Sequence, residues 1–145
     1  MKKNIIFLSF LNIWSMDKNK GAMSFSKTIE GYINAGWNVT LINPDYNVGI
    51  TPDINRLNII RYKPIFYRLC KTKYVSFFGR ILHALHGEYK LFRLAEKALQ
   101  SYNYNAVIYA YEVNGVIPGK KLTDKYRLPF ITRFQGTILA PLKNT

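Results

Sequence analysis

The sequence predicts an α/β fold in which a parallel sheet carries helices on both faces. Short apolar runs alternate with longer segments whose apolar residues recur at helical spacing. The first run, residues 5–10, is apolar apart from Ser9, which is typical of a strand buried on both faces. The order strand, helix, strand, strand, helix, strand, helix, strand then requires crossovers between parallel strands. This arrangement is Rossmann-like.

A helix is expected directly after the first strand and its polar loop. Phe25, Ile29 and Ile33 recur at helical spacing, with Ser24 as a plausible N-cap and Gly36 as the C-terminal stop. A glycine inside this helix, at position 31, costs about 1 kcal/mol of helix propensity. A close approach of the helix to the sheet would explain that glycine.

The middle of the chain predicts two strands and the longest helix. The strands cover 37–43 and 57–62, and they end at Pro44 and Pro64. The helix covers 75–101, and its apolar residues share one face at about 100° per residue. These residues are Phe78, Ile81, Leu82, Leu85, Tyr89, Phe92 and Leu99.

The last third predicts a strand, a short helix and a final strand. The fourth strand covers 106–111, and a loop and short helix follow in "EVNGVIPGKKLTDKY", with Pro118 suited to the first helical turn. The fifth strand covers 130–134. The whole chain, 1–145, is therefore expected to form a single domain.

The composition is that of a globular, basic protein. Of its 145 residues, 48% are hydrophobic and 20% are charged, which excludes a disordered chain. The formal net charge of +13 favours an anionic partner: nucleic acid, a phosphorylated sugar or an acidic membrane surface. One cysteine, Cys70, allows no internal disulfide, so a cytoplasmic location is the simpler interpretation. The start of the chain is similar to a signal peptide, but Asn12 interrupts the apolar run and no small-residue cleavage site follows.

Ligand-competent residues follow three of the predicted strands. In doubly wound sheets, ligands bind outside the carboxyl ends of the strands. The candidate substrate-binding residues at these ends are Lys20, Gly21, Tyr111, Glu112, Asn114, Arg133 and Gln135.

Each of these candidates has a plain alternative. The glycine loop around Gly21 leads into a helix N-terminus and could cradle phosphate, or it could be an ordinary turn, since it matches no complete phosphate motif. Glu112 could act as a base or bind sugar hydroxyls, or it could pair with a surface lysine. No second carboxylate stands near it to form a hydrolytic pair, and no catalytic residue can be named.

No metal site is expected. His83 and His86 are three residues apart on the predicted long helix, but no Cys, Asp or Glu completes a ligand set. Solvent-exposed surface histidines are therefore the preferred interpretation. Cys70 stands among basic residues and has no assigned partner base, so a structural role is favoured.

Basic residues lie opposite the apolar face of the long helix. A membrane surface could contact Arg80, Lys90, Arg93 and Lys97, helped by the basic and aromatic segment 61–73. The alternative is a crossover helix whose basic side is merely solvated. Nucleic acid has the same support from charge, but no recognisable motif.

Two stretches resemble one enzyme family in their order and spacing. "NIIFLSF…KGAMSFSKTIEGYINAGWNVTLINP" resembles the opening of family-4-type glycosyltransferases of the GT-B fold. "AVIYAYEVNGVIPGKKLTDKYRLPFITRFQGT" resembles the later part of their amino-terminal domain, where a helix ending in Lys-Tyr-x-x-Pro enters a strand. Residues 45–75 match least well. By position, Gly21 matches a glycine of the family's first loop, and Gln135, with Phe134 as its rival, matches a histidine near the donor sugar.

Two departures from the family pattern accompany this match. Lys20 stands where the family has a second glycine, and Trp37 stands where it has a histidine after Gly36.

The resemblance implies the acceptor-side half of a sugar transferase. Such an enzyme takes its sugar from a nucleotide-sugar donor, needs no cofactor and no metal, and acts on a sugar or lipid-linked acceptor in bacterial cell-surface polysaccharide or glycolipid synthesis. The donor-binding domain would come from a further domain or a partner chain, so the domain is expected to be incomplete at its C-terminal end. A cytoplasmic enzyme with peripheral contact at the inner membrane face is expected. The alternative is a non-enzymatic, basic Rossmann-like or flavodoxin-like module that binds an anionic membrane or nucleic acid.

Overall fold

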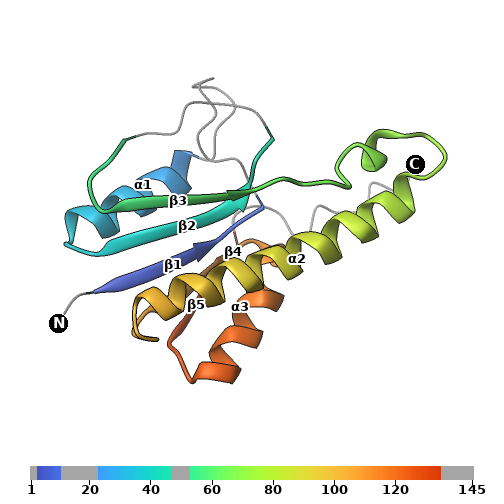
Figure 1. Cartoon of the computed structure of the whole chain (residues 1–145). Coiled ribbons are helices and arrows are strands. Elements are labelled where there is room, and N and C mark those ends of the chain that lie inside the picture. Colours follow the sequence, from blue (N-terminus) through green and yellow to red (C-terminus); the bar gives the residue numbers. More distant parts are fainter. Residues whose placement is uncertain (1–2, 11–22, 47–52, 135–145) are drawn as a thin grey trace.

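A computed structural model describes residues 3–10, 23–46 and 53–134, which form a parallel sheet flanked by helices (Figure 1). Within these residues the sheet has five strands in the order β3-β2-β1-β4-β5, and every pair is parallel. The strands are β1 (Asn4–Leu8), β2 (Asn38–Pro44), β3 (Leu57–Tyr62), β4 (Val107–Tyr111) and β5 (Phe130–Arg133). The predicted α/β class and all five predicted strands are confirmed, although β2 continues through Pro44, opposite Tyr62.

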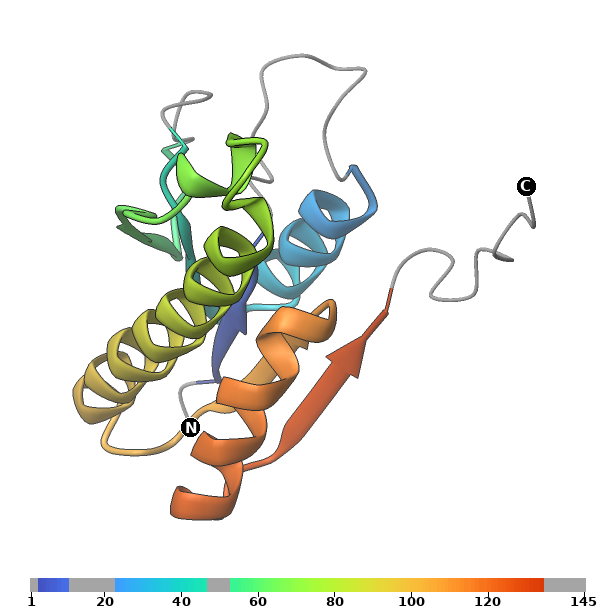
Figure 2. The ribbon, with the colours of Figure 1, turned by 90° about the vertical axis from the view of Figure 1, so that its right-hand side faces the viewer.

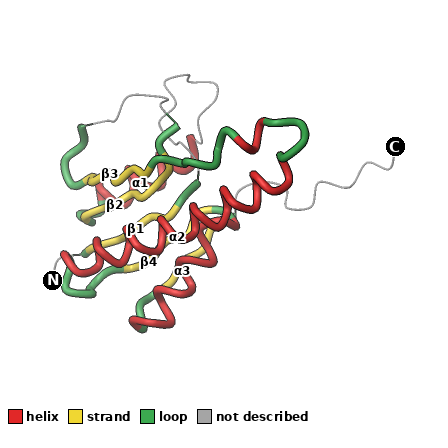
Figure 3. The backbone as a smooth tube through the Cα atoms, turned by 45° about the vertical axis from the view of Figure 1, so that its right-hand side comes forward, coloured by secondary structure: helices red, strands yellow, loops and turns green. Residues whose placement is uncertain are grey.

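Helices cover both faces of the sheet, as predicted. They are α1 (Met23–Asn34), α2 (Ser76–Ser101) and α3 (Val113–Tyr126). The short 3-10 helix η1 (Leu69–Lys71) packs on α2. α1 lies on one face, and α2 and α3 lie side by side on the other (Figures 2 and 3). The strand order reverses between β1 and β4, so the carboxyl ends of these two strands border the switch point of the sheet.

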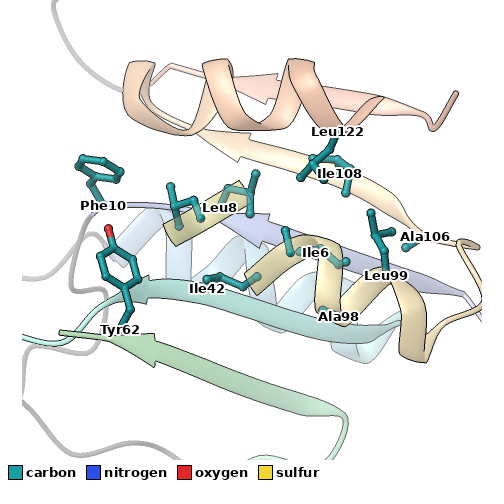
Figure 4. Close-up of a cluster of buried hydrophobic side chains, with 12 residues drawn as sticks. Ile6, Leu8, Phe10, Ile42, Tyr62, Ala98, Leu99, Ala106, Ile108 and Leu122 are labelled. Atoms are coloured by element: carbon teal, nitrogen blue, oxygen red, sulfur yellow. The ribbon is translucent and has the colours of Figure 1, made fainter. Parts of the chain in front are cut away.

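The two faces of the sheet pack differently. Below α2 and α3, the core is mainly aliphatic, with Ile6, Leu8 and Ile108 fully buried (Figure 4). Below α1 it is aromatic: Phe7 stacks on Tyr109 with ring centroids 4.4 Å apart. β1 is buried along its whole length because it contributes side chains to both cores.

The predicted C-terminal stop of α1 is confirmed. Gly36 adopts a φ of 84°, and the N–H groups of Gly36 and Trp37 donate to the carbonyl oxygens of Ile33 and Tyr32. This pairing is a Schellman motif, for which a residue without a Cβ is preferred.

The other expectations for α1 are wrong. Ser24 lies inside the first turn, because the helix begins at Met23. Gly31 is exposed, and a Cβ placed on it would meet nothing within 4 Å, so no close approach to the sheet explains it.

α3 differs from the prediction in its start. It begins at Val113, so Pro118 lies in the sixth position rather than the first turn. Pro118 has no N–H to donate to the Asn114 carbonyl oxygen, and the helix tolerates this near its N-terminus. Gly115 is the site of closest approach: a Cβ there would lie 2.6 Å from the carbonyl oxygen of Leu8 on β1. A glycine is needed at this position for α3 to reach the sheet.

The two halves of α2 have different environments, which corrects the predicted apolar face. The C-terminal half packs on the sheet and on α3 through Leu91, Ala95 and Leu99, all fully buried. The N-terminal half extends beyond the carboxyl ends of the strands (Figures 1 and 3), and its apolar face is largely exposed, with Phe78 at 68% and Leu85 at 58%. The predicted apolar face is therefore packed at its C-terminal end, where Leu99 is buried and Phe92 lies against the core, and is largely exposed at its N-terminal end.

Small residues make the contacts of the N-terminal half of α2 instead. A Cβ on Gly79 would lie 2.6 Å from the backbone of Leu69 in η1, and a Cβ on Gly87 would lie 2.2 Å from the Phe10 ring. Close packing at these two glycines turns the opposite, larger apolar side chains outward.

Candidate functional site

The carboxyl edge of the sheet has two parts, separated by β1. On one side, β4 leads into α3 through Glu112, and β5 ends at Arg133. On the other, β2 is followed by Asp45 and Tyr46, and β3 by the segment 63–68. We call these the β4–β5 side and the β2–β3 side.

Tyr111 is a fixed part of the β4–β5 side. Its side chain is buried at 1% exposure, and its ring stacks on Phe25 at 3.8 Å with a 12° interplanar angle. Its hydroxyl hydrogen-bonds Ser24 at the start of α1, and burial raises the Tyr111 pKa above its ordinary value. The predicted substrate-binding tyrosine thus joins α1 to the end of β4.

Glu112 has the most unusual backbone of this edge. Its φ of 63° and ψ of 172° fall in a region that is essentially confined to glycine. Its N–H donates to the Arg133 carbonyl oxygen, 3.0 Å away. Asn114 is exposed in the first turn of α3 beside it. A strained, non-glycine residue at the switch point of a parallel sheet is a feature that concentrates at functional sites.

Arg133 is engaged in contacts within the fold. Its Nη1 donates to the Thr28 hydroxyl on α1, and its guanidinium also hydrogen-bonds the Tyr109 hydroxyl. Burial, which outweighs this hydrogen bond, raises the Tyr109 pKa. Arg133 therefore connects the edge strand β5 to the neighbouring strand β4 and to α1. The remaining predicted substrate-binding residues, Lys20, Gly21 and Gln135, lie outside the described residues.

A pocket opens on the β2–β3 side. It has a volume of about 290 Å³ and is lined by Asp45, Tyr46, Lys63, Pro64, Ile65, Tyr67 and Arg68. We call it the β2–β3 pocket. In the sequence, the aromatic and basic residues of segment 61–73 indicated a membrane-contact surface and not a pocket.

The two histidines lie behind this pocket, which overturns the prediction of solvent-exposed surface residues. The Tyr46 hydroxyl and His83 Nε2 lie 3.3 Å apart, and the Tyr67 ring packs 5.8 Å from the His83 ring. His86 packs against Phe66 at 5.6 Å. Both histidines point toward the sheet because the glycines of α2 bring this side of the helix close to it. The one signal in the sequence was their position on the same side of the helix as Gly79 and Gly87.

Burial shifts the titration of this cluster. It lowers the pKa of both histidines, with a further contribution to His83 from His86 and to His86 from Lys90. Burial, followed by the neighbouring Tyr67 and Cys70, raises the pKa of Tyr46 to about 12. The lowered pKa of each histidine favours its neutral form.

Several buried polar atoms on the β2–β3 side lack a hydrogen-bond partner within the described parts of the chain. On the α2 face these atoms are the Tyr62 hydroxyl and the Nδ1 atoms of His83 and His86. On the α1 face they are both amide atoms of Asn43 and the Nε and Nη2 of Arg61. Asn43 and Arg61 are register partners, and Asn43 is completely buried. Buried polar groups are normally paired, so this concentration is unusual.

The predicted membrane-contact residues occupy different positions along α2. Arg80 is exposed on the N-terminal half, and Lys90 is half-buried. Arg93 donates to the buried Glu96 at 3.1 Å. Lys97 is exposed on the C-terminal half.

Glu96 is a structural link. It also accepts hydrogen bonds from Lys125 and Tyr126 of α3, at 2.7 Å and 2.6 Å. These bonds, that from Lys125 above all, lower the Glu96 pKa. Glu96 therefore ties α2 to α3.

A larger hollow, of about 780 Å³, lies at the opposite, amino edge of the strands. Its asparagines hold each other and the backbone: Asn4 Nδ2 donates to the Asn105 carbonyl oxygen at 2.9 Å, and Asn38 Nδ2 donates to Asn4 Oδ1 at 3.0 Å. Because these amides are already paired, and because ligands of parallel sheets bind at the carboxyl edge, we do not assign this hollow a function.

Within residues 3–10, 23–46 and 53–134, no three His, Cys, Asp or Glu side chains gather as a metal site would require. No helix in those same ranges has the length and apolar character needed to cross a membrane. Cys70 is a free thiol whose Sγ donates to the Phe66 carbonyl oxygen, as a structural cysteine would.

Comparison with known proteins adds no relative. No family model matches this chain, and neither a curated protein nor a solved structure is significantly similar to it.

Proposed function

We propose that this chain is the acceptor-binding half of a sugar transferase that uses a nucleotide-sugar donor. The observation that carries the proposal is the strained Glu112 turn at the switch point, where β4 passes into α3. A carboxylate at that position can accept a hydrogen bond, or a proton, from an acceptor hydroxyl. The resemblance of the sequence to amino-terminal domains of family-4-type glycosyltransferases supports the same assignment.

The donor is proposed to be held by a further domain or a partner chain. Transfer requires the anomeric carbon to be positioned next to the acceptor hydroxyl and the donor phosphates to be neutralised. Glu112, which is half-buried, and Asn114, which is exposed, are proposed to line one wall of such a cleft. No cofactor and no metal are proposed, and cell-surface polysaccharide or glycolipid is the proposed class of product.

The test is turnover of nucleotide-sugars by the chain alone and by the chain with a donor-binding domain. We expect no transfer by the chain alone and transfer by the pair. In the pair, Glu112→Gln should lower kcat by roughly 100-fold or more, because general base catalysis contributes about that much. Asp124→Asn, a charge-matched change on the exposed side of α3, should leave kcat unchanged. Sustained transfer by the chain alone, or equal effects of the two changes, would contradict the proposal.

A second surface favours contact with an anionic membrane. The N-terminal half of α2 exposes Phe77, Phe78, Ile81, Leu82, Leu85 and Tyr89, at 41–70% each. Lys71, Lys73 and Arg80 are exposed on or beside it. Apolar and basic side chains on one helix are the combination that binds the headgroup region of anionic bilayers. A peripheral location at the inner membrane face is proposed on this basis.

Co-sedimentation with vesicles tests this second surface. Binding to anionic vesicles should exceed binding to neutral ones and should fall at high salt, because each basic residue near the surface contributes about 1 kcal/mol that ions screen. The double change Phe77→Ser and Phe78→Ser should weaken binding, whereas Tyr104→Ser, at an exposed aromatic residue elsewhere, should not. Equal binding to both kinds of vesicle would rule out electrostatic attachment, and stronger binding to nucleic acid than to lipid would favour the alternative of a non-enzymatic basic module.

A further inference from the structure

The β2–β3 pocket combines features that suit a small ligand. Its volume of about 290 Å³ is close to the lower end of the roughly 300–1,000 Å³ that is typical of small-molecule sites. It lies directly after the carboxyl ends of β2 and β3, where parallel sheets bind ligands. Its position depends on backbone bonds that hold both segments: Asp45 N–H donates to the Tyr62 carbonyl oxygen at 2.8 Å, and Tyr67 N–H donates to the Pro64 carbonyl oxygen at 3.1 Å.

Aromatic rings form the inner wall of the pocket. Tyr46 and Tyr67 pack with ring centroids 4.6 Å apart and an interplanar angle of 51°. Both rings are half-buried, so each keeps part of its surface accessible. Pro64 and Ile65 add apolar surface beside them. Such a wall suits the apolar face of a ring-shaped ligand.

The rim of the pocket is basic with one carboxylate. Lys63 and Arg68 line it and are exposed, and Lys71 lies 4.7 Å above the Tyr67 ring centroid. Asp45 lines it as well. An arginine and a lysine that converge on one pocket match an oxyanion such as phosphate. A carboxylate next to them can accept hydrogen bonds from ligand hydroxyls.

Polar groups behind the wall hold it in a defined arrangement and lack partners of their own. The Tyr46 hydroxyl contacts His83 Nε2, whose other ring nitrogen is buried and unpartnered among the described residues. Tyr62 is only 6% exposed, and its hydroxyl also has no hydrogen-bond partner among the described residues. Tyr62 reaches toward Phe10 at the end of the buried cluster (Figure 4). Unmade hydrogen bonds of this kind cost stability, and they are tolerated more readily where a site has a use for them.

We infer that the β2–β3 pocket binds a sugar ring that carries a phosphate group. The ring lies on Tyr46 and Tyr67, the phosphate pairs with Lys63 and Arg68, and Asp45 accepts from a ring hydroxyl. The inference does not depend on the transferase proposal, because binding at this pocket is measured without a donor and without turnover. If both hold, the pocket is the place where a phosphorylated acceptor is anchored.

Calorimetric titration with glucose 1-phosphate tests the inference. Glucose and inorganic phosphate, each titrated alone at the same ionic strength, separate the contributions of ring and anion. We expect 1:1 saturable binding of glucose 1-phosphate, at least about tenfold tighter than that of either part, because both sets of contacts are then made together. No saturable binding, or binding no tighter than that of inorganic phosphate, would overturn it.

Substitutions place the binding at the pocket. Arg68→Met and Tyr67→Leu should each weaken glucose 1-phosphate binding by about tenfold or more, since each removes one group of contacts. Arg127→Met removes the same charge from an exposed residue after α3, and Tyr74→Leu changes a tyrosine that is 92% exposed. Both controls should bind as the unaltered chain does. Arg68 is exposed, so its variant keeps the test valid if Tyr67→Leu fails to fold. Equal weakening by Arg127→Met would show general attraction to a basic protein and would refute the assignment.

Discussion

The two sides of the carboxyl edge, divided by β1, use their polar side chains in opposite ways. On the β4–β5 side, Tyr111 bonds Ser24, and Arg133 bonds Thr28 and Tyr109. On the β2–β3 side, Asn43, Tyr62 and both histidines have buried atoms without partners in the described ranges. Polar residues near the strand ends are therefore not equivalent: some are paired within the fold, and others have buried atoms that are left unpaired.

Backbone strain distinguishes the β4–β5 side, and unmade hydrogen bonds distinguish the β2–β3 side. The Glu112 backbone is held in its glycine-like conformation by the contact of its N–H with β5 and by the close packing of α3 on β1. On the β2–β3 side neither Asp45 nor Tyr46 has a positive φ, but this side carries the unsatisfied amide and hydroxyl groups. Three pairs of substitutions and the pH dependence of unfolding test this contrast.

The largest effect is expected from Gly115→Ala. The new Cβ would lie 2.6 Å from the Leu8 carbonyl oxygen, so α3 must move away from β1. We expect the free energy of unfolding to fall by about 3 kcal/mol, as for other overpacked sites. Chemical denaturation measures it.

Gly31→Ala is the matched control. It also adds a methyl group to a helical glycine, but with nothing within 4 Å, and it should raise stability by about 1 kcal/mol. Similar effects of the two changes would mean that the β4–β5 side is not closely packed.

The next effect concerns two buried asparagines. Asn43→Leu keeps the size of the side chain and removes two unpartnered atoms, so the free energy of unfolding should rise by about 2 kcal/mol. Asn4→Leu, at a residue 8% exposed whose amide bonds Asn105 and Asn38, should lower it by a similar amount. Urea unfolding of both variants measures the difference. A loss of stability in Asn43→Leu would show that its amide is paired after all and would remove the contrast.

A smaller effect is expected from Glu112→Gly. Glycine relieves backbone strain of about 1–3 kcal/mol but adds entropy to the unfolded chain, so a net gain of about 1 kcal/mol is expected. Glu88→Gly, within α2, should instead lose about 1 kcal/mol. Thermal and urea unfolding compare the two. Destabilisation by Glu112→Gly would mean that the contacts of its side chain outweigh the strain.

The smallest effect is a pH dependence from the β2–β3 side. The pKa values of His83 and His86 are lowered in the folded chain. As the pH falls, the unfolded chain therefore binds protons at a higher pH than the folded chain does. The free energy of unfolding therefore keeps its full value above the unfolded pKa near 6.5. It declines as the pH falls toward the lowered pKa values of the folded chain, by less than about 1.4 kcal/mol per pH unit for each histidine. Unfolding measured from pH 7.5 to 5.5 should show this decline, and His86→Phe should reduce it. A free energy of unfolding that does not change over this pH range would mean that the two histidines are solvent-exposed in the folded chain.

Periodicity and strand order in the sequence were sufficient to predict the α/β class, the five strands and the extent of α2. These features depend on local pattern: the buried run of β1 and the glycine after α1 are each evident in a few consecutive residues. The carboxyl edge could also be located, because a parallel sheet places all such ends together.

Only the tertiary structure decided which polar groups the fold itself uses. Arg133 and Thr28 are far apart in the sequence, and so are Tyr46 and His83, and no periodicity reveals that they meet. The same holds for α2, where the larger apolar face was expected to be the packed one. Two glycines bring the other face against η1 and Phe10, so the histidines are half-buried and Phe78 is exposed. Close packing depends on the shape of the partner surface, which a single segment of sequence does not contain.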